Sequence, residues 1–360
     1  MKKTTLTSLL LGTLSLISIG ISAQENKIIA YLPTWGSDKP GIDQEYMLDH
    51  FYPKAITHLD IAFLGFKRNT DDWNDPNFAS LALDSFDIKN VDSILNNMHV
   101  QDRCKASGTK VMISVAGAGG YTFVWLLEKH YNNNKKLEEM ADLIANFAID
   151  RGLDGVDLVL ETWWDDPEIS NSTDKGGRIR KPSIGNDQGP HQIGTGFTNL
   201  CKILKPKLKA KNLLFSATVF STGWYGNNYD AGFFEEVDWV GIMTYDLTGL
   251  SDNSPKGPHA NLFDPPLNVY PGQSLNSPIL SVDNGFKYWQ GLLAPTWNSD
   301  GGFGMDGKKL LMGIPFYGFD FNSKKTRGYN HMSYKEILKE FPSAATSYDP
   351  KDPNWTCNKK

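Results

Sequence analysis

The chain has 360 residues, a formal net charge of −5 and an aromatic content of 12%. Its 36 lysine and arginine residues are dispersed, which argues against a nucleic-acid-binding protein, because such proteins concentrate basic residues in a patch. The three cysteines, Cys104, Cys201 and Cys357, do not have the spacing of a metal site. Cys104 and Cys201 lie in helical patterns, so we expect them to be buried thiols.

Residues 1–23 have the layout of a cleavable secretory signal. Lys2 and Lys3 precede an apolar run over residues 6–21, and a small alanine ends the stretch. A membrane anchor is the alternative, but the run is shorter than the roughly 18 apolar residues that a membrane span requires. We therefore expect a secreted protein, extracellular or periplasmic, with no membrane contact after cleavage and a single domain over residues 24–360.

Short apolar runs alternate with helical patterns along the rest of the chain. The predicted strands are residues 27–35, 55–66, 110–116, 152–161, 213–221, 237–245 and 309–317. The predicted helices are residues 91–105, 136–151, 198–210, 282–293 and 333–341. The strands are almost continuously apolar, as parallel strands covered on both faces are. The alternation therefore predicts a parallel α/β fold.

Seven strands of this type favour a (β/α)8 TIM-type barrel. A doubly wound sheet is the alternative, but no Gly-rich phosphate-binding turn follows the first strand. Two long polar segments, residues 165–195 and 246–280, are expected as loops at the mouth of the barrel. No eighth strand is recognisable after residue 317. Two interpretations remain open: the chain is truncated at its C-terminus, or a partner covers the gap.

The fourth predicted strand, residues 152–161, carries three acids in the apolar sequence GLDGVDLVLE. Because side chains alternate between the two faces of a strand, Asp157, Val159 and Glu161 share the face that points into the barrel. Asp154 has the opposite parity and is expected to shape the start of the strand. A carboxyl group in an apolar pocket beside like charges has a raised pKa and can act as a general acid. This pattern therefore indicates catalysis.

The acids admit two other interpretations. They could be salt-bridged or capping groups, but several acids along one buried face repel one another and lose their hydration. They could bind a metal, but no histidine lies nearby, and Trp163 and Trp164 follow Glu161 where further ligands would be needed. We therefore expect neither a metal nor an organic cofactor.

The acid pattern resembles the strand-4 motif D-x-x-D-x-D-x-E of family 18 glycoside hydrolases, the chitinases and endo-β-N-acetylglucosaminidases. The segments KIIAYLPTW, THLDIAF, KVMISVAGAGG, MTYDLTG and LMGIPFYG resemble the first, second, third, sixth and seventh strands of that family, in the same order. The residues that carry these matches are Phe63, Ser114, Gly117, Met243, Tyr245 and Asp246. The resemblance runs from about residue 27 to residue 340, which is most of the chain.

The resemblance implies retaining, substrate-assisted hydrolysis of β-1,4-linked N-acetylglucosamine polymers such as chitin, or of N-glycan cores. Glu161 matches the general acid that protonates the glycosidic oxygen. The acetamido oxygen of the substrate is then the nucleophile and an oxazolinium ion forms, unlike the usual two-carboxylate scheme. Tyr245 resembles the tyrosine that hydrogen-bonds the acetamido group, and Asp246 resembles a sugar-contacting aspartate. Asp157 resembles the inner acid that shares a proton with the third acid of the motif, while Asp154 shapes the strand.

The chain departs from the family pattern in two places. Val159 stands where the family has the third acid, which orients the acetamido group and offsets the oxazolinium charge. Losing one preorganised electrostatic group typically costs about 10²–10³ in rate. The second departure is the unrecognised eighth strand, which in the family carries a tryptophan under the −1 sugar. None of Trp289, Trp297 and Trp355 lies in a suitable strand context.

Several aromatic residues at or after the strand ends are candidates for stacking on sugar rings. They are Trp35, Trp163, Trp164, Trp224 and Tyr225, and Phe63 and Met243 complete the expected sugar-binding set. Three interpretations of the whole chain remain open. They are a glycoside hydrolase with weakened catalysis, a non-catalytic chitin- or glycan-binding protein on the same barrel, and a truncated product without a stable fold. Glu161, Tyr245 and Asp246 favour the enzyme, whereas Val159 favours the binding protein.

Overall fold

A computed structural model describes eleven stretches of the chain. They are residues 26–34, 51–72, 74–97, 99–117, 119–161, 192–221, 229–248, 258–263, 281–293, 302–319 and 331–342. The predicted secretory signal lies outside these residues. So do the aromatic candidates Trp35, Trp163, Trp164, Trp224 and Tyr225, together with Cys357.

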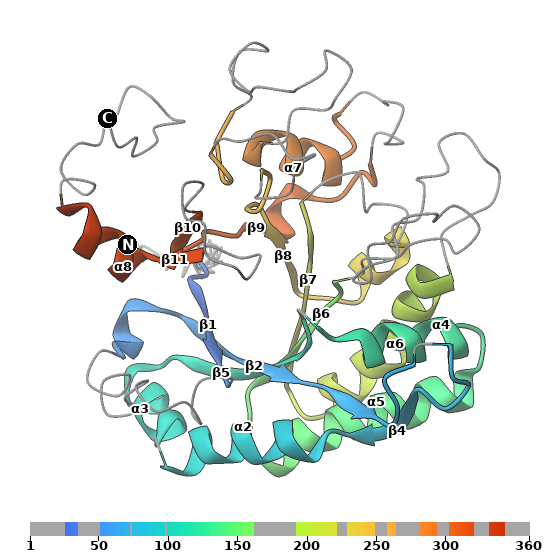
Figure 1. Cartoon of the computed structure of the whole chain (residues 1–360). Coiled ribbons are helices and arrows are strands. Elements are labelled where there is room, and N and C mark those ends of the chain that lie inside the picture. The colour runs from blue at the N-terminus through green and yellow to red at the C-terminus, as the bar shows by residue number, and fades with distance from the viewer. Residues whose placement is uncertain are drawn as a thin grey trace, which may run out of the picture.

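Seven parallel strands form one curled sheet within the described residues (Figure 1), in the order β1-β2-β5-β6-β7-β8-β9. Their bounds are β1 (Ile29–Pro33), β2 (His58–Leu64), β5 (Lys110–Ala116), β6 (Gly155–Val159), β7 (Leu214–Phe220), β8 (Trp239–Met243) and β9 (Leu310–Met312). All seven predicted strands are confirmed, and the sheet has the parallel, helix-covered form of a TIM-type barrel. β1 and β9 are its edges, and neither pairs with an eighth strand among the described residues.

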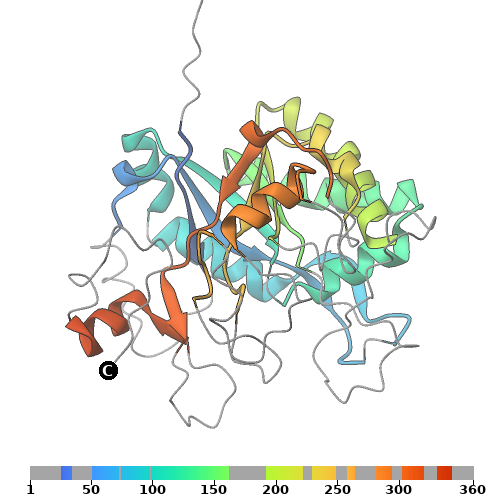
Figure 2. The ribbon, with the colours of Figure 1, turned by 90° about the horizontal axis from the view of Figure 1, so that it is seen from above.

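Helices cover the outer side of this sheet (Figures 1 and 2). They are α2 (Ser85–Asn97), α3 (Val100–Ser107), α4 (Tyr121–His130), α5 (Asn134–Asp150), α6 (Gln192–Lys209) and α7 (Val282–Trp289). The last helix, α8 (Tyr334–Glu340), lies apart from this sheet, against a short antiparallel pair formed by residues 317–319 and 331–333. Two antiparallel pairs lie beside the main sheet, β3 (Phe66–Arg68) with β4 (Ala79–Leu83) and β10 (Tyr317–Phe319) with β11 (His331–Ser333). Within the described residues, no helix has the length and apolar character needed to cross a bilayer.

The sequence of α5 explains why this segment is a helix packed on the sheet. Its fully buried side chains recur every three or four residues, which gives the helix one apolar face. They are Leu137, Met140, Ala141, Ile144, Ala145, Phe147 and Ala148. The side chain of Asn133 caps the first turn by accepting a hydrogen bond of 3.2 Å from the backbone N–H of Lys136.

Several predicted boundaries are wrong. The helix predicted over residues 198–210 begins at Gln192, within the segment 165–195 expected as a loop. The helix predicted over residues 91–105 is two helices, because His99 between α2 and α3 has a left-handed backbone with φ of 47°, which interrupts the helical hydrogen bonds. The strand predicted over residues 309–317 pairs with β8 only as far as Met312, and Tyr317 belongs instead to β10. The short helix expected over residues 333–341 is confirmed as α8.

The two faces of the curled sheet differ in chemistry. The outer face packs against the helices through aliphatic side chains, among them Ile61, Ile113, Val115, Val156, Leu158, Leu160, Val219 and Val240. Burying each such side chain contributes about 1.5–3 kcal/mol, so this layer carries the stability of the fold. The inner face instead carries buried polar groups, namely Asp60, Ser114, Asp157, Ser216 and Thr218. Folding therefore places the polar faces of β2, β5, β6 and β7 inside the barrel.

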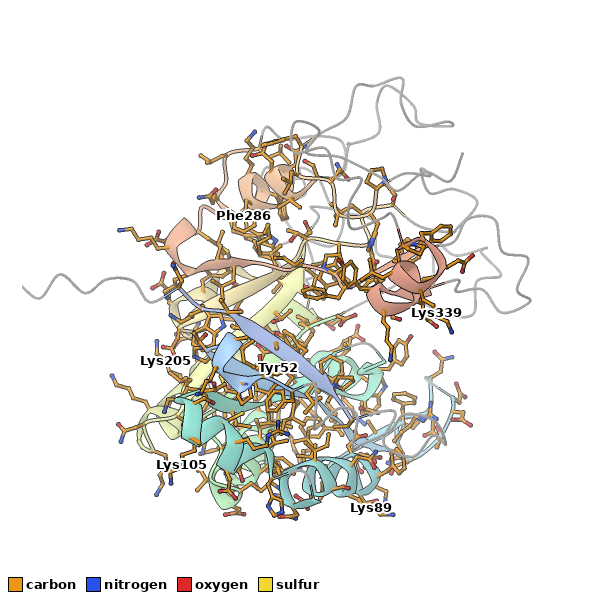
Figure 3. All side chains as sticks on the ribbon, turned by 90° about the vertical axis from the view of Figure 1, so that its left-hand side faces the viewer. Tyr52, Lys89, Lys105, Lys205, Phe286 and Lys339 are labelled. Carbon is orange, nitrogen blue, oxygen red and sulfur yellow. The ribbon has the colours of Figure 1, made fainter. Side chains whose placement is uncertain are left out.

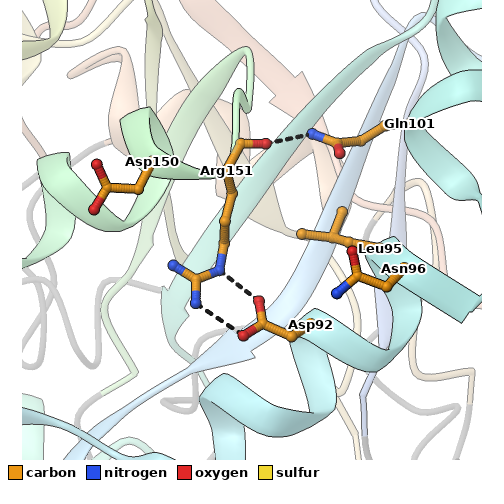
Figure 4. Close-up of a pocket in the computed structure, with 6 residues that line it drawn as sticks. All are labelled: Asp92, Leu95, Asn96, Gln101, Asp150 and Arg151. Carbon is orange, nitrogen blue, oxygen red and sulfur yellow. Dashed lines mark hydrogen bonds and ion pairs between the residues drawn. The ribbon is translucent and has the colours of Figure 1, made fainter.

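A polar surface pocket lies at the turn that leads into β6 (Figure 4). Arg151 makes two hydrogen bonds to Asp92 on α2, of 2.6 and 2.9 Å, and its carbonyl oxygen accepts a 2.7 Å hydrogen bond from Gln101 on α3. These contacts join α2, α3 and the end of α5. Because the pair is partly exposed, it contributes only about 1 kcal/mol or less. The pocket lies before β6, at the opposite end of that strand from Glu161, and its residues hold helices together.

The basic residues are spread over the molecule. Figure 3 views the molecule from the side of β1, and its labelled lysines, Lys89, Lys105, Lys205 and Lys339, lie around the periphery on separate elements. Several lysines of the described residues are paired with acids, as Lys207 is with Asp142 on α5. The structure thus agrees with the dispersed charge of the sequence.

Candidate active site

Asp157 lies on the inner face of β6 within a group of hydroxyl donors. Ser114 on β5 donates a 3.0 Å hydrogen bond to its Oδ2, and Ser216 on β7 donates a 2.7 Å hydrogen bond to its Oδ1. Tyr31 on β1 donates to Oδ2 at 3.1 Å, and Thr218 lies 3.3 Å from Oδ1. Burial raises the pKa of Asp157, while these hydroxyl groups oppose the shift by stabilising the ionised form. Ser114 thus contacts the predicted acid directly.

A second buried acid, Asp60 on β2, was not among the predicted site residues. It is fully buried, and neither of its carboxyl oxygens has a hydrogen-bonding partner among the described residues. Burial raises its pKa well above the usual range, and the neighbouring charge of Asp157 raises it further. The sequence contained a signal for it, because Asp60 has an inward parity in the strand segment THLDIAF, but its isolation depends on the strands around it.

Glu161 lies just beyond the end of β6, at the carboxyl end of the sheet. Burial and, to a smaller extent, the charge of Asp246 raise the pKa of Glu161 to about 7. Val159, between Asp157 and Glu161, is 2% exposed, so an apolar side chain fills the place of the third acid. The predicted parity of the strand is confirmed. Glu161 is therefore mostly protonated below about pH 7, as a general acid must be.

Asp246 lies after β8, where two residues distant in sequence contact it. Tyr317 on β10 donates a 2.6 Å hydrogen bond to its Oδ1, and Nδ1 of His259 lies 3.2 Å from the same oxygen. Nε2 of His259 lies 3.0 Å from the carbonyl oxygen of Tyr317. Tyr245 packs edge-on against the ring of Tyr317, and burial, Glu161 and Asp246 raise the pKa of its hydroxyl. Tyr245 and Tyr317 therefore remain neutral hydrogen-bond donors.

Four further predicted residues are located within the described part of the chain. Gly117 follows β5 with φ of +69°, and a Cβ there would lie 2.3 Å from the ring of Phe63. This close approach requires glycine and holds Phe63 at the carboxyl end of β2. Met243 ends β8 and is buried. Asp154 lies at the start of β6, where it pairs with Lys110 at 2.9 Å, far along the strand from Glu161.

The side chain of Tyr229 hydrogen-bonds the backbone immediately before Glu161. Its hydroxyl donates a 2.7 Å hydrogen bond to the carbonyl oxygen of Leu160 and accepts a 3.1 Å hydrogen bond from the backbone N–H of Phe220. Trp289 on α7 donates to the carbonyl oxygen of Phe220 at 2.9 Å and packs against the ring of Tyr229. Trp289 is therefore a buried packing residue on a helix, in agreement with its lack of a strand context in the sequence. No local sequence pattern identified Tyr229.

We expect Tyr229→Phe to lower the free energy of unfolding by about 1–3 kcal/mol, because it leaves a buried carbonyl and a buried N–H without their partner. Urea unfolding followed by tryptophan fluorescence measures the change. Tyr52→Phe, at a residue that is 67% exposed, is the matched control and should change stability by less than about 0.5 kcal/mol. Equal effects of the two substitutions would show that the hydrogen bonds of the Tyr229 hydroxyl do not contribute to stability.

The site therefore combines Glu161, whose pKa is raised to about 7, with Tyr245 and Asp246 just after β8, while the buried Asp157 lies deeper in the barrel at the middle of β6. Such an arrangement can donate a proton to a leaving oxygen and hold an uncharged polar group beside it. The described residues contain no cluster of three or more histidine, cysteine or acidic side chains suited to a metal ion. Cys104 and Cys201 are buried in α3 and α6, as predicted, and lie outside the site.

Comparison with known proteins agrees with the motif. The sequence profile of glycosyl hydrolases family 18 matches residues 27–359. Chitinase A1 of Niallia circulans is 25% identical over an alignment of 345 positions that covers 82% of this chain and 43% of that protein, so the chain spans less than half of its length. A chitinase-like effector of Moniliophthora roreri is 25% identical over 352 residues, which are 96% of this chain and 71% of that protein.

Solved structures agree on the fold. The Group IV chitinase of Ostrinia furnacalis in complex with allosamidin has a TM-score of 0.61 at 20% identity, with 88% of this chain and 79% of that chain covered. The chitinase-like agglutinin of Robinia pseudoacacia has a TM-score of 0.56 at 20% identity, with 87% of this chain and 80% of that chain covered. Because the family profile covers most of the chain, the resemblance inferred from the sequence is confirmed, and this chain belongs to glycosyl hydrolases family 18.

Proposed function

We propose that the chain is a secreted glycoside hydrolase that cleaves β-1,4-linked N-acetylglucosamine polymers, chitin or its oligosaccharides, by substrate-assisted retaining hydrolysis. Glu161 protonates the glycosidic oxygen, and the acetamido oxygen of the substrate attacks the anomeric carbon. Tyr245 and Asp246 contact the acetamido group and the sugar. Turnover is weakened because Val159 provides no charge beside the oxazolinium ion.

One observation carries this proposal. The buried Glu161 has a pKa of about 7 and lies beside Tyr245 and Asp246 at the carboxyl end of the sheet. In TIM-type barrels the chemistry takes place at this end. A carboxyl group that is held protonated near neutral pH suits a general acid, and a group that served only to contact a glycan would not need that property.

A non-catalytic glycan-binding protein is the second candidate, and Val159 favours it. This side chain is 2% exposed and occupies the place of the acid that would orient the acetamido group. The similar proteins include the chitinase-like effector and the chitinase-like agglutinin as well as chitinases. On this alternative, the barrel still binds N-acetylglucosamine-containing glycans but does not cleave them.

Mass-spectrometric product analysis of an N-acetylglucosamine hexamer incubated with the purified protein tests both candidates, with calorimetric binding of the same hexamer alongside. Shorter oligomers would support the hydrolase. Binding of an intact hexamer would support the glycan-binding protein. If the folded protein neither binds nor cleaves the hexamer, both proposals are wrong for this substrate.

The pH dependence of hydrolysis follows from the charge state of Glu161. A general acid works only while it is protonated, and the pKa of Glu161 is about 7, so the rate should be high below this pH. Above pH 7 we expect it to fall about tenfold per pH unit, because the protonated fraction falls by that factor. A rate profile of hexamer cleavage from pH 4 to 9 measures this. A rate that stays constant up to pH 9 would mean that Glu161 is not the proton donor.

A further inference from the structure

Asp60 is an acid buried inside the barrel without a hydrogen-bonding partner among the described residues. It lies at the centre of β2, where Tyr31 of β1 and Met112 of β5 are its lateral neighbours. It is 0% exposed, and neither carboxyl oxygen meets the geometry of a hydrogen bond. An ionised carboxylate in such surroundings would lose its hydration without compensation. The charge-neutral, protonated form of Asp60 is therefore the stable one.

Tyr31 connects Asp60 to Asp157. Its backbone is paired with Asp60, its hydroxyl donates a 3.1 Å hydrogen bond to Asp157 Oδ2, and the same hydroxyl lies 2.8 Å from Oγ1 of Thr218. Although the residue as a whole is 43% exposed along the edge strand β1, its hydroxyl end reaches these buried groups. The tyrosine hydroxyl thus lies between the two acids of the barrel interior.

The two acids have unequal surroundings. Asp157 accepts hydrogen bonds from the hydroxyl groups of Ser114, Ser216 and Tyr31, which stabilise a negative charge. At Asp60 no donor meets the distance and angle of a hydrogen bond, and only the nearby Tyr31 hydroxyl stabilises its charge, less than burial and Asp157 oppose it. Two buried carboxyl groups that repel each other do not both ionise, and the charge resides where donors surround it.

We propose that Asp60 is a positioning residue that keeps the proton of this buried pair, so that Asp157 carries the single negative charge inside the barrel below Glu161. Position 159 has no acid that could share a proton with Asp157. The protonated Asp60 on β2 therefore serves as the neutral partner of Asp157 instead. The effect on catalysis rests on the proposed hydrolase function, because the Asp157 charge would then offset the oxazolinium ion. The placement of the proton does not rest on that function.

The pH dependence of stability has a definite sign. The ionisable groups around Asp60 in the described residues are Tyr31 on β1, Asp157 on β6 and His58, two positions earlier on the same face of β2. The pKa of Asp60 is raised in the folded state above its ordinary value of 3.8, so the folded protein binds the proton more tightly than the unfolded chain does. Its contribution to stability therefore falls as the pH rises above about 4.

Thermal unfolding of Asp60→Asn from pH 4 to 8 tests this placement. Asparagine has the shape of a neutral aspartic acid, so the variant should fold. Its melting temperature relative to the parent should rise steadily with pH. Asp142→Asn, which removes a partly exposed ion pair with Lys207, is the matched control, and its difference from the parent should stay nearly constant across the range. If the difference between Asp60→Asn and the parent is the same at every pH, Asp60 does not hold a proton and the proposal is wrong.

Infrared spectroscopy locates the proton independently of activity. The measurement is made at pH 8 on the Glu161→Gln variant, so that neither of two other raised acids contributes a protonated-carboxyl band. Glu161 has been replaced, and Asp87 is ionised because its pKa is about 6. We expect a protonated-carboxyl band that disappears on adding Asp60→Asn and remains on adding Asp142→Asn. A band that disappears only on adding Asp157→Asn, or the absence of any such band, would overturn the proposal.

Kinetics then test the consequence for the reaction. In an otherwise wild-type chain, Asp60→Asn should retain kcat within about threefold, whereas Asp157→Asn should lower it by about 10²–10³ because it removes the charge. The reverse order would overturn the proposal. If the parent has no hydrolytic activity, the proposed function fails, and the unfolding and infrared results alone decide where the proton resides.

Discussion

Glu161→Gln is expected to reduce hydrolysis of the N-acetylglucosamine hexamer by about 10²–10⁴, because glutamine keeps the shape of the side chain and cannot donate an acidic proton. Binding of the hexamer should remain within a few-fold of the parent. Single-turnover rates measured by mass spectrometry, with calorimetric affinities alongside, separate the two quantities. Loss of kcat with retained affinity would identify Glu161 as the acid of the reaction.

The stability of the same variant provides the control. The pKa of Glu161 is raised from 4.5 to about 7 in the folded protein. The parent therefore loses stability as the pH rises from about 4.5 to about 7. Glu161→Gln should therefore be as stable as the parent at pH 5 and more stable by about 1–3 kcal/mol at pH 8. A variant that folds and cleaves the hexamer at the parental rate would exclude Glu161 as the proton donor.

Val159→Asp is expected to raise the hydrolysis rate by about 10²–10³, because it restores a negative charge beside the reacting sugar. The new carboxyl group would lie between Ala116 and Thr218, which are the lateral neighbours of position 159. It would also lie near Asp157, so folding should become less favourable by about 1–3 kcal/mol. Hexamer cleavage and urea unfolding of the same preparation measure both effects.

Val159→Asn is the matched control, since it adds polarity and similar volume without charge. It should share the loss of stability and lack most of the gain in rate. If Val159→Asp cleaves the hexamer while the parent only binds it, the parent is a glycan-binding protein that lacks hydrolytic activity because of Val159. A folded Val159→Asp that is no faster than the parent would show that another feature limits turnover.

Hydroxyl groups from three strands surround the buried carboxyl group of Asp157 inside the barrel. Ser114, Ser216, Thr218 and Tyr31 come from β5, β7 and β1, and all four surround one carboxyl group on β6. Each of them lies on the polar, inward face of a strand whose other face is aliphatic. The stability of the barrel and the charge state of Asp157 therefore depend on the same alternation of side chains.

The sequence by itself determined the strands, the family and the parity of the acid strand. Alternation over residues 152–161 separates Asp157, Val159 and Glu161 from Val156, Leu158 and Leu160, and the structure places these two groups on opposite faces. The place of Glu161 at the carboxyl end of its strand also followed from the sequence. These features are local, because the alternation of side chains within one strand does not depend on which strands lie beside it.

The tertiary structure alone decided which groups meet. Tyr317 reaches Asp246 across 71 residues, and Tyr31 reaches Asp157 across 126 residues. The isolation of Asp60 and the break between α2 and α3 at His99 likewise depend on neighbouring elements or on a single backbone angle. Strand register and long-range packing set these contacts, and register is fixed only when all the strands are assembled. The sequence therefore identified Asp157, Glu161 and Asp246 but not Asp60, whereas the assembled sheet determined which groups surround each of these acids.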